Sequence, residues 1–198
     1  KASKVYRSPE EFDGKKEQAL YYAMIAQIDD QFARLLQALE ESGQKDNTLI
    51  IFTSDHGEAL GDHGLILKGC RFYEGLVRVP LIFSWPGVIK ENIQANGLVE
   101  LLDLSATILD FAGLEIPEYF QGNSLRSILE GRESGEHIRD SVRCEYFDAI
   151  SAHFCGGNGT WATMYRRDQY KLSVYHGLNV GELYDLEADL WEHRNLWD

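Results

Sequence analysis

Residues 53–69 read TSDHGEALGDHGLILKG and follow directly on an apolar run, Leu49–Phe52. Four such residues in a row, β-branched, aliphatic or aromatic, favour a strand buried on both faces, the kind found in parallel sheets. In open α/β sheets, ligands bind just outside the carboxyl ends of the strands. The sequence therefore predicts a strand ending near Asp55 and His56, with a binding site there and a glycine-rich loop that carries Lys68.

Asp55 and His56 are a candidate pair of metal ligands. Carboxylate oxygens suit hard divalent cations, and an imidazole can complete the set. The dipeptide alone also fits a purely structural role, in which Asp55 caps the next turn and His56 makes an ordinary polar contact. The buried strand before the pair and Lys68 after it favour the metal. Two side chains cannot complete a shell of about six donors, so further ligands must come from elsewhere.

Lys68 is the candidate contact for an anionic substrate, because its ammonium group acts as a point charge toward sulfuryl or phosphoryl oxygens. An isolated lysine is more often simply solvated. Asp62 and His63 repeat the acid–imidazole pair without an apolar run before them. We expect them to support the loop, with substrate contact by His63 as the alternative. The other histidines are scattered and expected at the surface, and Trp191 and Trp197 are expected to anchor the C-terminus.

Helical and strand patterns alternate in the first two thirds of the chain, which is typical of an α/β fold. Apolar residues recur at steps of three and four within 17–41 and predict a helix ended by Gly43. A second apolar run covers 79–85, with Pro80 at its start. Two short helices are predicted to follow, each with a candidate N-cap and a terminal glycine: Asp103 with Gly113, and Ser124 with Gly131.

Residues 132–140 are strongly polar and form the best candidate boundary between domains. Beyond them, short aromatic and β-branched runs alternate with Gly, Asn or Asp, a pattern typical of an antiparallel meander. The predicted strands cover 141–147, 160–166, 170–175 and 182–185. We therefore predict two domains, residues 1–133 and residues 134–198.

The composition excludes some classes of partner. Nineteen basic and thirty-two acidic residues give a net charge of −13, which argues against nucleic acid and anionic membranes. No apolar stretch approaches the roughly 18 residues needed to span a bilayer. An anionic substrate would need a locally positive site, which a metal and Lys68 can supply. The cysteines, Cys70, Cys144 and Cys155, lack Cys-x-x-Cys spacing and are odd in number, so they predict free thiols.

Residues 54–58 and 60–65, together with Lys68, resemble the second metal-binding motif of type I sulfatases, members of the alkaline phosphatase superfamily. The resemblance covers nearly everything after residue 17. Further stretches agree in order along the chain: 22–25 with 29–30, 79–82, 103–104 to 112–113, 122–125, and 182–186 with 195–196.

This resemblance implies an α/β fold. A partial α/β/α sandwich of the alkaline phosphatase-like type would reach about residue 133, and a small antiparallel β subdomain with helix would follow. Asp55 and His56 would ligate a divalent ion, usually Ca²⁺, with Mn²⁺ or Mg²⁺ as alternatives. Lys68 would bind the sulfate of a small-molecule or sugar sulfate ester and add catalytic charge stabilisation as the bond breaks.

Sulfatases also carry a Cys- or Ser-x-Pro-x-Arg motif, whose first residue becomes a formylglycine nucleophile, and two earlier metal-binding aspartates. Neither feature has a counterpart here, and none of the three cysteines begins that motif. We therefore expect this chain to be the C-terminal half of a sulfatase, with the N-terminal half as its partner. The sequence indicates no compartment or oligomeric state.

Two other functions stay open on the sequence. A phosphonate monoester or phosphodiester hydrolase of the same superfamily carries very similar motifs. A non-catalytic metal-binding module would use the same ligands and catalyse nothing. The stretch from Gly64 to Lys68 and the ending at 182–185 look more like sulfatases than phosphonate hydrolases, which favours sulfate esters.

Overall fold

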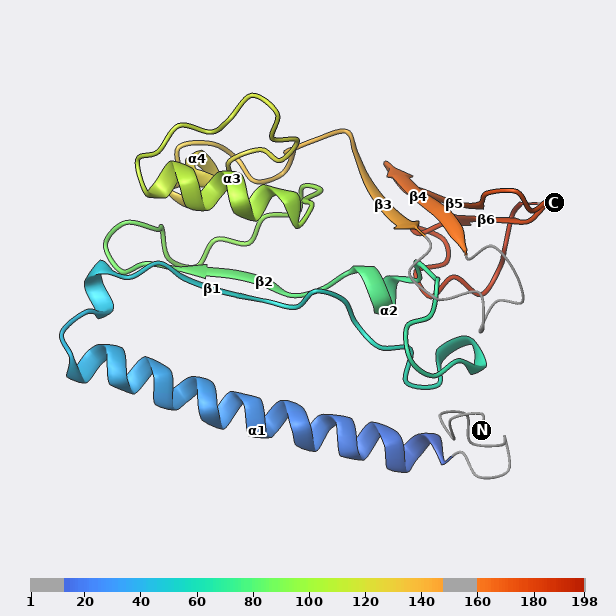
Figure 1. The fold of residues 1–198 in the computed structure, drawn as a ribbon, viewed down its shortest axis with the longest axis horizontal. Helices are drawn as coiled ribbons and strands as arrows, with labels where there is room; N and C mark the ends of the chain where they lie inside the picture. The colour runs from blue at the N-terminus through green and yellow to red at the C-terminus, as the bar shows by residue number, and fades with distance from the viewer. Residues whose placement is uncertain (1–12, 148–159, 198) are drawn as a thin grey trace.

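The computed structural model describes residues 13–147 and 160–197 of the chain. The elements of the first part are α1 (Gly14–Glu41), the 3-10 turn η1 (Lys45–Asn47), β1 (Ile50–Thr53), the 3-10 turn η2 (Asp62–Gly64), α2 (Glu74–Val77), β2 (Leu81–Ser84), α3 (Leu102–Phe111) and α4 (Arg126–Leu129). Helix α1 lies on one side of β1 and β2, and α3 and α4 lie on the other (Figure 1). This layering gives the mixed α/β character that the sequence predicts.

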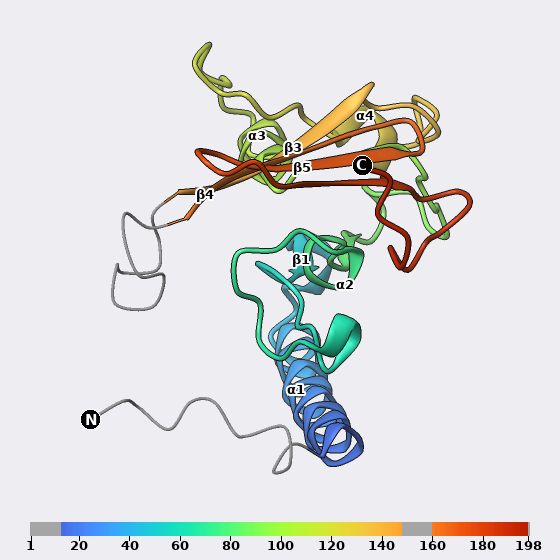
Figure 2. The same ribbon diagram turned by 90° about the vertical axis from the view of Figure 1, so that its right-hand side faces the viewer.

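Four strands make up the C-terminal sheet: β3 (Ser141–Phe147), β4 (Trp161–Arg167), β5 (Tyr170–Tyr175) and β6 (Gly181–Asp185). They pair in chain order, and all three pairings are antiparallel. The predicted meander is therefore confirmed, with strand bounds within one residue of the prediction. In Figure 2 this sheet lies on the same side of β1 as α3, opposite α1.

The core of the C-terminal sheet includes a residue from outside it. Ala162, Met164 and Tyr175 form a buried cluster with Phe72, which precedes α2. The two predicted domains thus share apolar contacts, and the boundary at 133/134 stays a prediction. Cys70 and Cys144 are both partly buried, whereas Cys155 lies outside the described residues, so the expectation of three free thiols stays a prediction.

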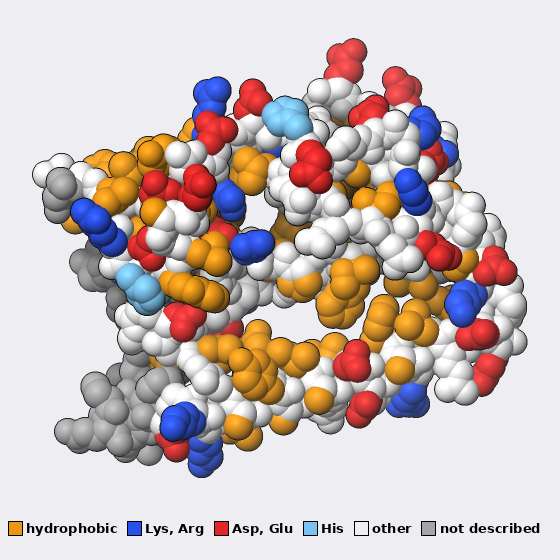
Figure 3. Space-filling view, turned by 180° about the vertical axis from the view of Figure 1, so that it is seen from behind, with side chains coloured by type: hydrophobic (Ala, Val, Ile, Leu, Met, Phe, Trp, Pro, Cys, Tyr) orange, Lys and Arg blue, Asp and Glu red, His pale blue; other side chains and the backbone are white. Residues whose placement is uncertain are grey.

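Helix α1 begins three residues earlier than predicted because Asp13 caps it, accepting a hydrogen bond from the Lys16 N–H at 3.2 Å. It ends as predicted, with Gly43 in the left-handed region at φ 68°. No described residue of α1 is buried, and Leu35 in its apolar stripe is 63% exposed. Figure 3 shows apolar side chains along α1 facing a hollow between the helix and the rest of the molecule.

Strand β1 differs from its prediction in its partner and its burial. It pairs with β2 in an antiparallel arrangement, with Ile50 opposite Ser84 and Thr53 opposite Leu81. The expectation of a parallel neighbour is wrong for the described residues, where β2 is the strand that β1 contacts. All four residues of β1 are only partly buried. An apolar run predicts a strand but not the direction of its neighbour, and a two-stranded ribbon leaves a face uncovered.

Asp103 is not the N-cap of α3, which begins one residue before it. Its fully buried carboxylate accepts backbone N–H bonds from Glu100 at 2.8 Å and Asn123 at 2.7 Å, and pairs with the Arg139 guanidinium. A carboxylate ahead of an apolar stripe suits a cap, but a distant arginine and two loop amides bind this one instead.

The other predicted helix boundaries agree better with the structure. Ser124 is not the N-cap of α4, which is Leu125, but its hydroxyl accepts a hydrogen bond from the Arg126 N–H at 3.2 Å. Gly113 and Gly131 end their helices with φ of 70° and 72°. No helix of the described residues is long and apolar enough to cross a membrane.

Candidate functional site

The site begins where β1 ends. The Ser54 hydroxyl donates to the His56 carbonyl at 2.8 Å, which fixes the turn out of the strand. The His56 N–H donates to Oδ1 of Asp55 at 3.0 Å, and this bond is the main reason that the pKa of Asp55 lies below its ordinary value. Asp55 is therefore an ionised carboxylate, and its side chain is 83% exposed at the strand end.

The imidazole of His56 is oriented by its own backbone neighbour. Its Nδ1–H donates to the Gly57 carbonyl at 2.8 Å, which leaves the lone pair on Nε2 free to face outward. Oδ2 of Asp55 lies 3.3 Å from this Nε2. The Lys68 ammonium group donates to the same nitrogen across twelve positions of sequence. The structure thus brings together the three residues that the sequence singles out.

The loop between the pair and Lys68 turns back on itself. The Gly61 N–H donates to the Leu65 carbonyl at 2.7 Å, and η2 forms the turn between them. Gly61 and Gly64 have φ of 103° and 69°, a region that glycine enters without steric cost. This reversal returns Lys68 to the end of β1.

Gly57 lies against α2, and the contact leaves no room for a side chain. Its N–H donates to the Leu76 carbonyl at 2.8 Å, and a Cβ on Gly57 would lie 1.9 Å from the Gly75 carbonyl oxygen. We therefore expect Gly57→Ala to displace His56 and to destabilise the fold by about 2 kcal/mol, measured by urea unfolding.

Gly75→Ala is the matched control for this prediction. A Cβ on Gly75 would meet its nearest neighbour, Oδ2 of Asp62, at an ordinary 3.7 Å, and alanine suits a helix better than glycine. The control should leave stability unchanged or slightly raised. Similar losses in the two variants would contradict the close approach seen at Gly57.

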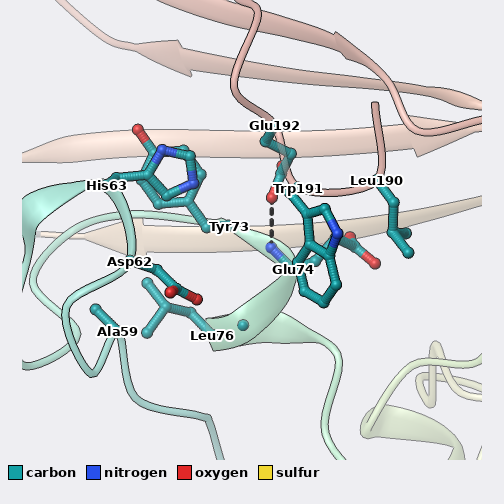
Figure 4. Close-up of a pocket in the computed structure, with 10 residues that line it drawn as sticks. Ala59, Asp62, His63, Tyr73, Glu74, Leu76, Leu190, Trp191 and Glu192 are labelled. Carbon is teal, nitrogen blue, oxygen red and sulfur yellow. Dashed lines mark hydrogen bonds between the residues drawn. The ribbon is translucent and has the colours of Figure 1, made fainter. Parts of the chain in front are cut away.

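His63 lies at a second place, in the wall of a small pocket (Figure 4). Its ring stacks on Tyr73, with centroids 3.9 Å apart and an angle of 8° between the planes, and His193 lies 5.6 Å away. The pocket is lined by Ala59, Asp62, His63, Tyr73, Glu74, Gly75, Leu76, Leu190, Trp191 and Glu192. Substrate contact by His63 stays a prediction, while the stacking agrees with a role in supporting the loop.

The two tryptophans near the C-terminus behave differently. Trp197 packs over Gly181, where a Cβ would lie 2.6 Å from the indole, so it anchors the C-terminus as expected. Trp191 is 66% exposed and lines the pocket instead. Sequence reasoning also missed the buried lysine Lys171 and its partners Glu74 and Glu192. The signal was a lysine on the inward side of an alternating strand.

Asp55 and His56 fit two positions of a divalent-cation site, because an ionised oxygen donor and an imidazole nitrogen with a lone pair lie close together at the end of β1. They do not fit a complete site. The described residues contain no group of three or more His, Cys, Asp or Glu side chains that could hold a metal ion. In a mixed α/β fold, this arrangement suits a protein that binds an anionic group between two metal-type ligands and a lysine.

Comparison with known proteins identifies the family. The family model described as Sulfatase matches residues 3–114, and the model described as N-sulphoglucosamine sulphohydrolase, C-terminal, matches residues 61–198. The chain therefore belongs to the sulfatase family. An N-acetylglucosamine-6-O-sulfatase of Bacteroides thetaiotaomicron is 34% identical over 89% of this chain and 31% of its own length. An arylsulfatase of Clostridium perfringens is 35% identical over 92% of this chain and 36% of its own.

Solved structures give the same fold. BT4656, solved in complex with its substrate D-glucosamine-2-N,6-O-disulfate, matches with a TM-score of 0.78 and 34% identity, over 89% of this chain and 35% of that one. A phosphonate monoester hydrolase of Agrobacterium radiobacter matches with a TM-score of 0.82 and 33% identity, over 96% of this chain and 39% of that one. The chain spans about a third of the length of the curated relatives it matches.

Proposed function

We propose that this chain supplies the C-terminal part of a sulfatase that hydrolyses sulfate esters of sugars. The observation that carries the proposal is the convergence of Asp55, His56 and Lys68 at the end of β1. Asp55 and His56 would ligate a divalent cation, and Lys68 would bind an oxygen of the sulfate. The substrate class follows the sulfated-sugar enzymes among the relatives.

The chain's own residues have distinct tasks in this proposal. The Gly57 carbonyl holds Nδ1–H of His56, so that Nε2 is presented to the cation with a fixed orientation. The lowered pKa of Asp55 keeps its carboxylate ionised for the same purpose. A divalent cation held there would neutralise charge on the ester oxygens. Ca²⁺ is favoured by the family resemblance, with Mn²⁺ and Mg²⁺ as alternatives to be separated by metal analysis.

Lys68 would change partner when substrate binds. In the structure, its ammonium group donates to Nε2 of His56. Nε2 of His56 would hold the cation, and the Lys68 ammonium group would pair with a sulfate oxygen instead. Lys68 would then stabilise the negative charge that grows on the ester oxygens as the bond breaks.

A formylglycine nucleophile and the remaining metal ligands would come from an N-terminal part of the enzyme. The apolar stripe of α1 supports such a partner, because Leu20, Met24 and Ile28 are all at least half exposed. The incomplete set of ligands supports it too. A non-catalytic module would bind metal through the same two residues and show no turnover after the N-terminal part is added.

A phosphonate monoester hydrolase is the second candidate, because a solved enzyme of that name matches this chain with the TM-score of 0.82 given above. The test compares kcat/KM of the complete enzyme for p-nitrophenyl sulfate, p-nitrophenyl phenylphosphonate and a matched phosphodiester, with sulfated sugars in the same panel. We expect a sulfate ester to be preferred. A phosphorus ester that beats every sulfate by more than about tenfold, or roughly 1.4 kcal/mol of barrier, would exclude the sulfatase assignment.

A further inference from the structure

The segment that follows Lys68 is bound to the C-terminal sheet. Only Gly69 separates Lys68 from residues 70–74, which we call the anchored segment. Phe72, in its middle, is 4% exposed and packs on Ala162, Met164 and Tyr175 of the sheet. Two polar attachments accompany this apolar contact.

The first attachment consists of three buried charges, Lys171, Glu74 and Glu192, and the partly buried Arg166, which together we call the buried ion cluster. Lys171 on β5 is 1% exposed, and its ammonium group donates to the Phe72 carbonyl at 2.8 Å and to Oε1 of Glu74 at 2.9 Å. It also pairs with the carboxylate of Glu192. The second oxygen of Glu74 lies 3.6 Å from Arg166 on β4.

Glu192 extends this cluster to the C-terminal end of the chain. Its Oε2 accepts the Glu74 backbone N–H at 2.6 Å, the bond drawn in Figure 4. Glu192 is 3% exposed and has a φ of 61°, a conformation that an L-residue adopts only when its surroundings hold it there. One lysine thus connects a sheet strand, the start of α2 and the end of the chain.

The second attachment involves Glu182 on β6. Its carboxylate accepts hydrogen bonds from the Tyr73 and Tyr175 hydroxyls, each at 3.1 Å. The Arg71 guanidinium lies 3.9 Å from the same carboxylate and 5.2 Å from the centre of the Tyr175 ring. Each residue from Arg71 to Glu74 therefore contacts a side chain of the C-terminal sheet.

Buried charges are costly to desolvate, and a buried pair adds little net stability compared with apolar side chains of the same size. Their directional bonds nevertheless fix one arrangement, because any shift of the segment would leave a buried charge unpaired. The apolar contact of Phe72 alone would hold the segment less specifically. The cluster is thus suited to setting a position.

We propose that the buried ion cluster positions Lys68. Lys171 binds the anchored segment to the C-terminal sheet, and the segment holds the Lys68 ammonium group at the end of β1. Lys171 is in this view a positioning residue that acts through Lys68. The kinetic part of the test rests on the proposed sulfatase function, whereas the exchange part does not.

The first measurement is hydrogen–deuterium exchange in the complete enzyme carrying Lys171→Met. We expect the amides of residues 66–72 to exchange at least about tenfold faster, while those of α3 keep their rate. Lys45→Met is the matched control, because the ion pair of Lys45 with Glu40, at 3.3 Å, is exposed. Glu192→Gln removes one charge of the cluster with little change of shape, and decides the question if Lys171→Met does not fold.

The second measurement is a double-mutant cycle on kcat. Lys171→Met should lower kcat by about tenfold in the enzyme that has Lys68, and by less than about twofold when Lys68 is already alanine. If Lys171→Met lowers kcat by the same factor with and without Lys68, the proposal is overturned. Exchange that is equally faster in α3 would overturn it too. If no ester is turned over at all, the proposed function fails, and the exchange rates alone decide the positioning role.

Discussion

Replacing His56 by alanine in the complete enzyme is expected to remove the bound divalent cation and to lower kcat/KM by at least about a hundredfold. The lost group is the Nε2 nitrogen, which the Gly57 carbonyl orients through Nδ1–H at 2.8 Å. Asp55→Ala should have the same two effects, because its carboxylate lies 3.3 Å from that nitrogen. Metal content by mass spectrometry of the desalted protein and initial rates on a sulfate ester measure both.

His176→Ala is the matched control for this prediction. His176 is an exposed imidazole that shares a hydrogen bond of 2.8 Å with the Thr163 hydroxyl, on the C-terminal sheet. Its loss should change neither metal content nor rate. Full metal occupancy in both Asp55→Ala and His56→Ala would falsify the ligand assignment, whatever happens to the activity.

The position of the candidate site could be predicted because local sequence determines it. An apolar run ends at Phe52, and two metal-type side chains follow at once. The return of Lys68 to His56 depends on how the loop folds, which local sequence does not determine. Leu60, His63 and Leu67 all have positive φ there, at 50°, 54° and 64°. No periodicity predicts left-handed residues other than glycine.

Contacts between distant parts of the chain explain the errors. The local sequence favours Asp103 as a helix cap. Arg139, 36 positions later, pairs with its carboxylate and makes Asp103 a buried ion instead. The antiparallel neighbour of β1 comes after a long loop, and apolar character does not encode strand direction. In both cases a tertiary partner decided the outcome.

Lys171 shows that some distant contacts do leave a signal. It lies between Tyr170 and Leu172, and the alternation of a strand places it on the same face as Ser173 and Tyr175. All three are buried, at 1%, 1% and 5% exposure. A lysine on the inward face implies a buried carboxylate partner. The identity of that partner could not be read from the sequence, because Glu74 is 97 positions away.

The 198-residue chain alone is expected to turn over no sulfate ester, and addition of the proposed N-terminal part is expected to restore turnover. Asp55 and His56 would supply only two of the metal ligands, and the sequence carries no Cys- or Ser-x-Pro-x-Arg motif for a formylglycine. The measurement is the rate on an aryl sulfate for the chain, for the N-terminal part and for their mixture. A mixture containing Lys68→Met chain should assemble and stay far slower, because assembly does not depend on Lys68.

Assembly itself should depend on the apolar stripe of α1. Leu35 belongs to that stripe and is 63% exposed, so burying it against a partner would contribute about 2 kcal/mol. Leu35→Lys should therefore weaken restoration by at least about tenfold. Gln37→Lys places the same charge on the polar face of the helix, where Gln37 bonds to Glu41 at 2.7 Å, and should restore activity normally. Turnover by the purified chain alone, free of complete enzyme, would show that its own residues provide a nucleophile. The proposal that the N-terminal part supplies the nucleophile would then be wrong.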